Sequence, residues 1–450
     1  MELNKQAAQA FNGRANELPQ RLTVRQLPSR SSAKQRFAPD VHVSATISAQ
    51  NIRNLTITQR DREGREAGKA FPHEGATLEL VGEAYQDLKK TAVGMQKSPD
   101  LRRSVSVELL IDLIFEWVKK RYLQVTAEPM TEYVLNECEK RIRNFEVWIP
   151  IASTHIQSEL RFGQMTIKTI TREMLDRWEA EFRNEHPEMP PGAEEFFVRW
   201  RKDVLGLAAA TIELKAEPTR AYEVGLIEAQ KTLDLLRCLS PQNVFPFVVS
   251  YSVPLGHDAP RSFYYLLTEN NKVVISTRGI EQTPFDRWII DDDYIAEMKK
   301  FGVDALSRLL TIEKRTAFQE QVLDALQLYG RSSTFKGSAE KLAYILTSLE
   351  SLLLSNQSQS EEDLAERLAL LVDKTLAGRK QAFETTMNIY KRRLSFIRGE
   401  NAADDIKLLE QFMAAAWTFI INCIGYADKY ETRDEFILAI DALKLSGGLK

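Results

Sequence analysis

Cysteine and histidine are scarce in this chain of 450 residues, and several familiar motifs are missing. The three cysteines, Cys138, Cys238 and Cys423, lie far apart and form no CxxC pair, which argues against a disulfide framework or a structural zinc site. The chain also lacks the GxxxxGK[ST] and GxGxxG loops that cradle phosphates and the HExxH pair that binds catalytic zinc. The sequence therefore predicts no P-loop, Rossmann or zinc enzyme, and we expect no cofactor.

Neither sign of charge dominates, because 60 basic side chains face 63 acidic ones and give a net charge of −3. Any contact with nucleic acid would therefore depend on a local basic patch. The first twenty residues lack the apolar core of a signal peptide. An uncharged run at residues 411–427 is shorter than the roughly 20 residues that span a bilayer, so it predicts a buried core helix. Together with the cysteine usage, these features predict a soluble, cytoplasmic protein with no membrane partner.

The first forty residues differ in character from the rest of the chain. Residues 1–40 hold seven basic and three acidic side chains, and prolines at positions 19, 28 and 39 interrupt any long periodic pattern. The sequence predicts a basic, partly disordered leader here. A basic arm that touches phosphates is the alternative interpretation.

Residues 41–290 mix strand-like and helix-like patterns and predict a mixed α/β domain. Alternating or continuous apolar runs indicate strands at 41–47, 55–57, 78–80, 147–151, 156–162, 165–170, 210–214, 245–253, 263–267 and 273–277. Helical spacing appears at 104–122, after Pro129, and from Pro218 to about Cys238. The clearest linker is HPEMPPG, residues 186–192. The six tryptophans are scattered along the chain, so no stacking platform for single-stranded nucleic acid is predicted.

Strand patterns stop near Asp291, and the remaining residues predict helices only. Residues 291–330 are expected to be connecting helices, and RSSTFKGS (331–338) marks the expected start of a helical bundle over 331–450. Apolar stripes indicate five helices in that bundle. The aspartates at 291–293 predict a solvated first helical turn rather than a cation site. The expected fold class is thus α+β, with a mixed α/β N-terminal region followed by an all-α bundle.

Basic residues gather on the third helix of this bundle. Residues 379–398 contain six cations against Glu384 alone, for a local charge of +5: Arg379, Lys380, Lys391, Arg392, Arg393 and Arg398. The helix macrodipole favours cations near a helix C-terminus, which explains two or three of them. The surplus favours a surface that binds phosphate.

Three segments around this helix follow one another between Ala343 and Gly399: YILTSLESLLL, DLAERLALLVD and YKRRLSFIRG. In this order they resemble the Apea-like branch of the HEPN superfamily, in which a Leu-Glu-x-Leu-Leu helix and a Leu-Ala-x-Arg helix precede a Tyr-x-x-Arg segment. The matching positions here are Glu350, Arg367, Tyr390, Arg393 and Gly399. The resemblance covers about 110 of the 450 residues. It implies a dimerising helical bundle that binds RNA or cleaves it without a metal, often in prokaryotic anti-phage or toxin systems.

The chain departs from the active members of that superfamily at one position. In those members four to six residues separate the arginine from a histidine, whereas Arg398 stands at that spacing in this chain and no histidine lies beyond His257. Arginine stays protonated, so it cannot act as a general base, although it can clamp a phosphate. We therefore predict a degenerate R-x4-R site that binds RNA or a nucleotide. Its expected residues are Arg393 and Arg398, with Lys391, Arg392, Arg379 and Lys380 on phosphates, Glu350 and Tyr390 in support, and no metal.

Three alternatives stay open. An active endoribonuclease would hold the scissile phosphate on Arg393 and take its acid or base from the upstream region. A protein-interaction module would form a homodimer through the bundle and present the cations to an acidic partner. In the simplest case the cations only cap a helix.

Overall fold

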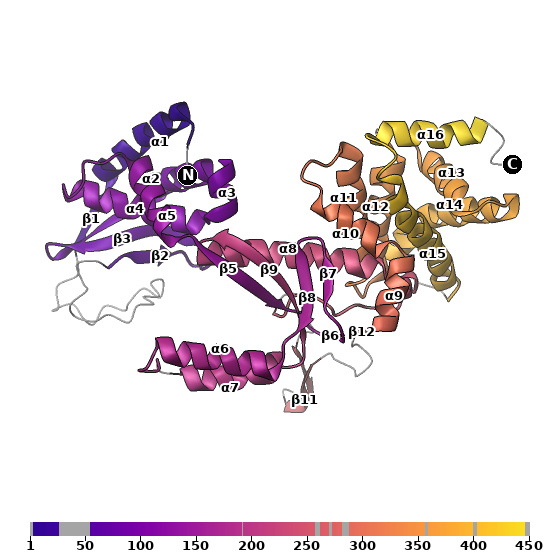
Figure 1. The fold of residues 1–450 in the computed structure, drawn as a ribbon, viewed down its shortest axis with the longest axis horizontal. Coiled ribbons are helices and arrows are strands. Elements are labelled where there is room, and N and C mark those ends of the chain that lie inside the picture. The colour runs from indigo at the N-terminus through magenta and orange to yellow at the C-terminus, as the bar shows by residue number, and fades with distance from the viewer. Residues whose placement is uncertain are drawn as a thin grey trace. The chain divides into compact units, whose positions relative to one another are not determined.

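The structure, a computed structural model, describes residues 3–26, 55–190, 192–256, 262–269, 272–280, 288–355, 359–398 and 403–445 (Figure 1). The fold is α+β, as the sequence predicts. The chain divides into two compact units: unit 1 takes residues 1–146 and 213–224, and unit 2 takes residues 147–212 and 225–450. The single mixed domain predicted for residues 41–290 is thus divided between the two units.

Unit 1 packs helices on an antiparallel sheet with strand order β1-β4-β3-β2. Its core joins Phe71 of the sheet to Leu88 and Trp117 of two helices, all fully buried. Its elements are α1 (Lys5–Glu17), a 3-10 turn (Leu18–Arg21), β1 (Thr23–Gln26), β2 (Ile57–Arg60), β3 (Glu66–His73), β4 (Ala76–Val81), α2 (Gly82–Gln96), α3 (Pro99–Ser104), α4 (Val107–Tyr122) and α5 (Met130–Arg141).

The predicted leader is instead part of unit 1 where the structure describes it. Ala15 and Leu18 are buried in the core, and Phe11 packs against it. These residues recur at helical spacing, so α1 has an apolar face that the core covers. β1 then pairs with β4 in an antiparallel ladder. The rest of the predicted leader and the strand expected at 41–47 lie outside the described residues.

Two small sheets and a hairpin are built mainly from the first half of unit 2, and three of their elements and helices also include residues of unit 1. One sheet has the order β5-β9-β8-β7, and β6 pairs with β12 in parallel. The elements are β5 (Arg143–Pro150), β6 (Thr154–Ile156), β7 (Leu160–Phe162), β8 (Met165–Thr169), α6 (Arg172–Glu185), α7 (Ala193–Val204), β9 (Ala208–Ala216), α8 (Pro218–Cys238), a 3-10 turn (Pro241–Val244), β10 (Ser262–Glu269), β11 (Lys272–Ile280) and β12 (Trp288–Ile290). The strands expected on either side of Gly163 and of Asn270 pair as the antiparallel hairpins β7–β8 and β10–β11.

The second half of unit 2 is all helical, as expected after Asp291. Its helices are α9 (Asp292–Lys300), α10 (Val303–Thr311), α11 (Ala317–Ser332), α12 (Ser338–Leu353), α13 (Glu361–Val372), α14 (Leu376–Arg398), α15 (Ala403–Tyr426) and α16 (Arg433–Leu445). Within the described ranges, α15 is the one helix long and apolar enough to cross a membrane. It packs against α11, α12, α13 and α14 in the bundle of Figure 1, which is the packing of a core helix.

The bundle begins earlier than the sequence predicts. The expected boundary at 331–338 is only the turn between α11 and α12, and these two helices pack against each other. Phe318, Val322, Leu326 and Tyr329 of α11 are fully buried, and the helix also contacts α15 and α16. The apolar stripe of α11 is therefore part of the bundle core, and residues 317–330 are not a connector.

The strand expected at 245–253 is absent, because other groups take its backbone carbonyls. The buried Arg237 guanidinium donates to the carbonyl of Ser252, and the Lys341 ammonium donates to the carbonyl of Val248. Pro246 in addition lacks the N–H that a ladder needs. The segment is thus an irregular strap held by two cations from α8 and α12.

Lys341 makes the stability of this strap depend on pH. Burial lowers the pKa of its ammonium from 10.5 to about 8, and the residue is 1% exposed. Between these two pKa values the unfolded chain binds more protons than the folded one, so this group makes folding more favourable as pH rises. We expect the free energy of unfolding in urea to rise with pH more in the native chain than in a Lys341→Met variant. Between pH 7.5 and pH 10, the difference between the two proteins should change by about 2 kcal/mol in favour of the native chain. Parallel pH profiles for the two proteins would contradict this.

Candidate functional site beside helix α14

Two residues singled out by the motif order meet in the bundle, although 40 positions separate them. The Tyr390 hydroxyl on α14 donates to Oε1 of Glu350 on α12 at 3.0 Å. Burial and the neighbouring carboxylate both raise the pKa of Tyr390. The phenol therefore stays protonated at neutral pH and acts as a hydrogen-bond donor, not as a base.

A cavity of about 480 Å³ opens beside this pair. Its wall includes two carboxylates, one phenol and one guanidinium, and its lining residues are Glu350, Leu354, Ser355, Gln359, Glu361, Tyr390 and Arg433. Arg433, at the start of α16, donates to the carbonyl of Ser355 at 2.8 Å and to that of Ser351 at 3.3 Å. Its Nε is buried and finds no partner among the described residues.

Arg367 lies at the family's arginine position on α13, but its bonds are internal. Its Nε and Nη2 donate to the two carboxylate oxygens of Asp441 on α16, each at 2.9 Å. Its Nη1 donates to the carbonyl of Leu353 at 2.6 Å and to Oε1 of Gln359 at 2.9 Å. The side chain is 7% exposed, so the guanidinium ties α12, α13 and α16 together beneath the cavity and is not free for a phosphate.

The cations of α14 form two separate groups. Arg379 donates to the carbonyl of Asp373 at 2.9 Å, and Lys380 lies 3.8 Å from Glu384, both near the start of the helix. Lys391, the first cation of the other group, is eleven residues further along, or about 17 Å at 1.5 Å per residue. The six cations thus do not make one continuous patch.

The second group follows Tyr390 directly in sequence, near the end of α14. Arg392 is tied to the buried carboxylate of Asp405 at the start of α15. Lys391 and Arg393 are exposed, and neither has an ion pair or a side-chain hydrogen bond within the described part of the chain. The charge of Arg393 acts on the Tyr390 phenol, where it opposes the rise in pKa, so Arg393 lies close to the Glu350–Tyr390 pair. The Arg398 side chain and Gly399 lie outside the described residues.

This arrangement suits the binding of an anion better than proton transfer. Two exposed cations can neutralise phosphates, whereas the one proton of the Tyr390 hydroxyl is already donated to Glu350. The proton acceptors of the described cavity are the carboxylates of Glu350 and Glu361. In the described ranges, no group of three or more His, Cys, Asp or Glu side chains is placed to hold a metal ion.

The sequence did not indicate several residues of this site, among them Glu361, Asp405, Arg433 and Asp441. Each acts on a distant segment, as Arg433 does on Ser355 across 78 positions. No periodic pattern relates such positions, so they come together only where α13 and α14 pack on each other, α15 packs on α14, and α16 packs on α12 and α13. Three of the six tryptophans, which are scattered along the sequence, are neighbours elsewhere in unit 2: Trp148, Trp178 and Trp200.

Comparison with known proteins adds no relative. No family model matches the chain, and no curated protein or solved structure is significantly similar to it. The HEPN resemblance therefore rests on the motif order in residues 343–399 alone.

Proposed function

We propose that this protein binds RNA phosphates through Lys391 and Arg393 at the end of α14, beside the cavity that holds the Glu350–Tyr390 pair. The observation that supports this most is the exposure of these two cations without a described partner, next to a hydrogen-bonding cavity. Arginine and lysine on a convex helix end suit a flexible phosphate backbone. Through its resemblance to HEPN proteins, we further place the chain among cytoplasmic prokaryotic proteins of the defence or toxin type.

Binding without cleavage is the form of this function that we favour. Cleavage of RNA at a 2′-hydroxyl needs a group that exchanges a proton near neutral pH, and histidine is the usual one. The chain has no histidine after His257, and a protonated arginine cannot replace it. An endoribonuclease is the alternative, with Arg393 on the scissile phosphate and a carboxylate of the cavity as the proton acceptor.

The Arg393→Ala variant should bind mixed-sequence RNA and transfer RNA about tenfold more weakly than the native chain in EDTA at low salt. Loss of one phosphate contact should also lower the salt dependence of binding by about one ion. Gel shifts at several salt concentrations measure both effects, and the same gels show any cleavage products. Lys380→Ala should change affinity little, because Lys380 lies at the other end of the helix.

Lys300→Ala is the matched control, because Lys300 is also an exposed cation in the last turn of a helix. If Arg393→Ala and Lys300→Ala bind RNA equally well, the proposed site is wrong. A lower melting temperature for Arg393→Ala with no change in RNA binding would show that the cation only caps α14. Metal-independent cleavage that Arg393→Ala abolishes would establish the nuclease, whereas activity gained only by Arg398→His would support a degenerate centre.

A further inference from the structure

A helical arm interrupts the sheet of unit 2 where a tight turn would suffice. Strands β8 and β9 are antiparallel neighbours and pair up to Thr169 and Ala208. Backbone bonds from Ile170 to Leu207 at 2.9 Å and from Gly206 to Ile170 at 3.0 Å then close the base. A short loop can join such strand ends, but the chain inserts the antiparallel helices α6 and α7 instead.

The base of this arm is anchored and its far half is not. Leu175 and Val204, near the base, are buried in a small core with Ile170 and Ala209, and Trp148, Trp178 and Trp200 pack against that core. Beyond it, Arg201 links α7 to Glu179 of α6 at 2.7 Å. Phe196, in the far half, is 58% exposed. The far half therefore presents apolar surface that no described residue covers.

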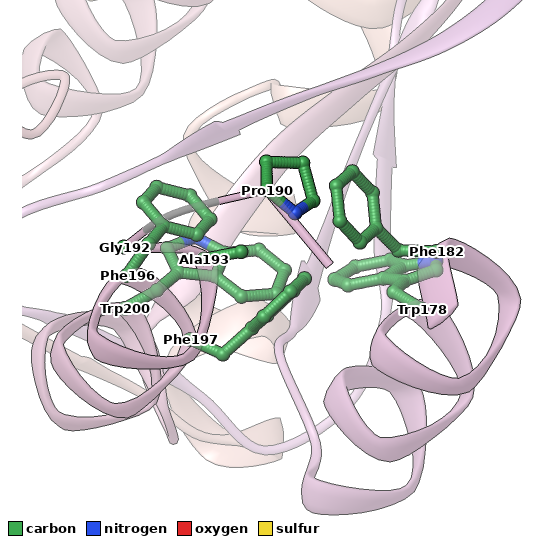
Figure 2. A pocket seen from close by; sticks show the side chains of 8 residues that line it. All are labelled: Trp178, Phe182, Pro190, Gly192, Ala193, Phe196, Phe197 and Trp200. Atoms are coloured by element: carbon green, nitrogen blue, oxygen red, sulfur yellow. The ribbon is translucent and has the colours of Figure 1, made fainter. Parts of the chain in front are cut away.

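An aromatic pocket of about 490 Å³ lies in that exposed half (Figure 2). Trp178 and Phe182 come from α6 and Phe196, Phe197 and Trp200 from α7, and Figure 2 shows Pro190 above them. The Phe196 and Trp200 rings are stacked with an interplanar angle of 15° and centroids 6.1 Å apart. Trp200 also lies 5.7 Å from Trp178, so the two helices share one continuous aromatic lining.

Acidic side chains predominate on the segment that joins the two halves of the pocket lining, residues 181–196, which we call the rim. Residues 181–196 contain five acidic residues against one cation: Glu181, Glu185, Glu188, Glu194 and Glu195 against Arg183. All five are exposed, and Arg183 is already engaged by Glu179 at 2.8 Å and by Glu194 at 3.6 Å. Such a rim repels phosphates and attracts cations. The stacked rings therefore do not suit a nucleobase on a nucleic-acid strand, although their faces would otherwise allow it.

We propose that this pocket binds an arginine side chain from a basic segment of a partner protein. A guanidinium stacks on aromatic faces, its apolar stem covers the ring surfaces, and its positive charge is attracted by the surplus of carboxylates on the rim. One ligand thus accounts for both the aromatic lining and the acidic rim. The site uses none of the residues of α14, so it stands independently of the RNA-binding function.

A labelled synthetic peptide with three arginines separated by glycine and serine tests the site by fluorescence anisotropy with the full chain. We expect saturable binding to the native protein and about tenfold weaker binding to Phe196→Ser. The same peptide with citrulline in place of arginine keeps the shape but removes the charge, and it should lose affinity to a similar extent. Val198→Ser is the matched control, because Val198 is 71% exposed on the same helix and does not line the pocket.

Several outcomes would overturn the proposal. Equal binding of the peptide to native chain and Phe196→Ser would place it elsewhere on the acidic surface. Equal binding of the citrulline peptide would show that charge plays no part. Binding of oligo(dT) that Phe196→Ser abolishes would assign the pocket to nucleic acid. Self-association in the ultracentrifuge that is lost in Phe196→Ser would assign it to a second copy of the chain.

Discussion

Replacing Gly330 by alanine should lower the free energy of unfolding by about 3 kcal/mol. Gly330 lies within α11, where alanine would ordinarily stabilise a helix by roughly 0.5–1 kcal/mol. A Cβ at this position would overlap the carbonyl oxygen of Asp234 on α8 and lie 2.7 Å from its carbonyl carbon. Both obstacles are backbone atoms, which cannot rotate away as a side chain can. The two helices would have to separate, and the buried bonds of Arg237 to Gly330 and to the strap would be strained.

Gly425→Ala is the matched control, because Gly425 is also a helical glycine of the bundle and its Cβ would meet nothing within 4 Å. We expect this variant to be as stable as the native chain or more stable by up to roughly 1 kcal/mol. Urea unfolding followed by far-ultraviolet circular dichroism compares the three proteins. A Gly330→Ala variant that matches Gly425→Ala would show that α8 and α11 do not approach as closely as described.

The helices of the bundle could be predicted because local signals specify them. The Ser360–Asp363 capping box forms at the start of α13, and Asp291 caps α9 as the aspartate run indicated. The capping groups and the apolar stripes lie within a few turns of each other, so periodicity and cap chemistry suffice. The close approach of α8 to α11 at Gly330 could not be predicted in this way. A glycine within a helical sequence does not indicate which other helix packs against it.

Long-range side-chain bonds account for most of what the sequence did not indicate. The 245–253 segment has the composition of a strand, but Arg237 and Lys341 take its carbonyls from distant helices. The apolar face of α1 is too short to predict a buried helix from the sequence alone. Its role is evident only from the core of unit 1, which covers it. The aromatic arm did leave a signal: Trp178 with Phe182, and Phe196 with Trp200, are each four residues apart on either side of the HPEMPPG linker.

Only part of the candidate site could be predicted from the sequence, because many of its contacts are also long-range. The motif order pointed to Glu350 and Tyr390, which the structure brings into contact. The charge count grouped six cations because they lie on one helix. That helix has 23 residues, so cations near its two ends are too far apart to form one patch. The partners that engage Arg392 and Arg367 lie on other helices and depend on how those helices pack.

Arg367→Met should lower the free energy of unfolding by about 3 kcal/mol. Methionine keeps the apolar stem, but the carbonyl of Leu353 and the amide of Gln359 lose their bonds to the guanidinium. Asp441 also loses a bidentate partner, although this carboxylate is 42% exposed and water can solvate it. Most of the cost should therefore come from the buried groups.

Lys444→Met separates this effect from the loss of an ordinary ion pair. Lys444 also links α16 to α13, through Glu366, but the pair is exposed to solvent and should contribute little to stability. Urea unfolding without RNA should thus rank the variants as native, Lys444→Met and Arg367→Met in falling stability. If Arg367→Met is as stable as Lys444→Met, the guanidinium is not a structural tie. A variant of normal stability that loses RNA binding would instead give Arg367 a direct role in binding RNA, because a residue that holds the cavity together must affect folding before it affects a ligand.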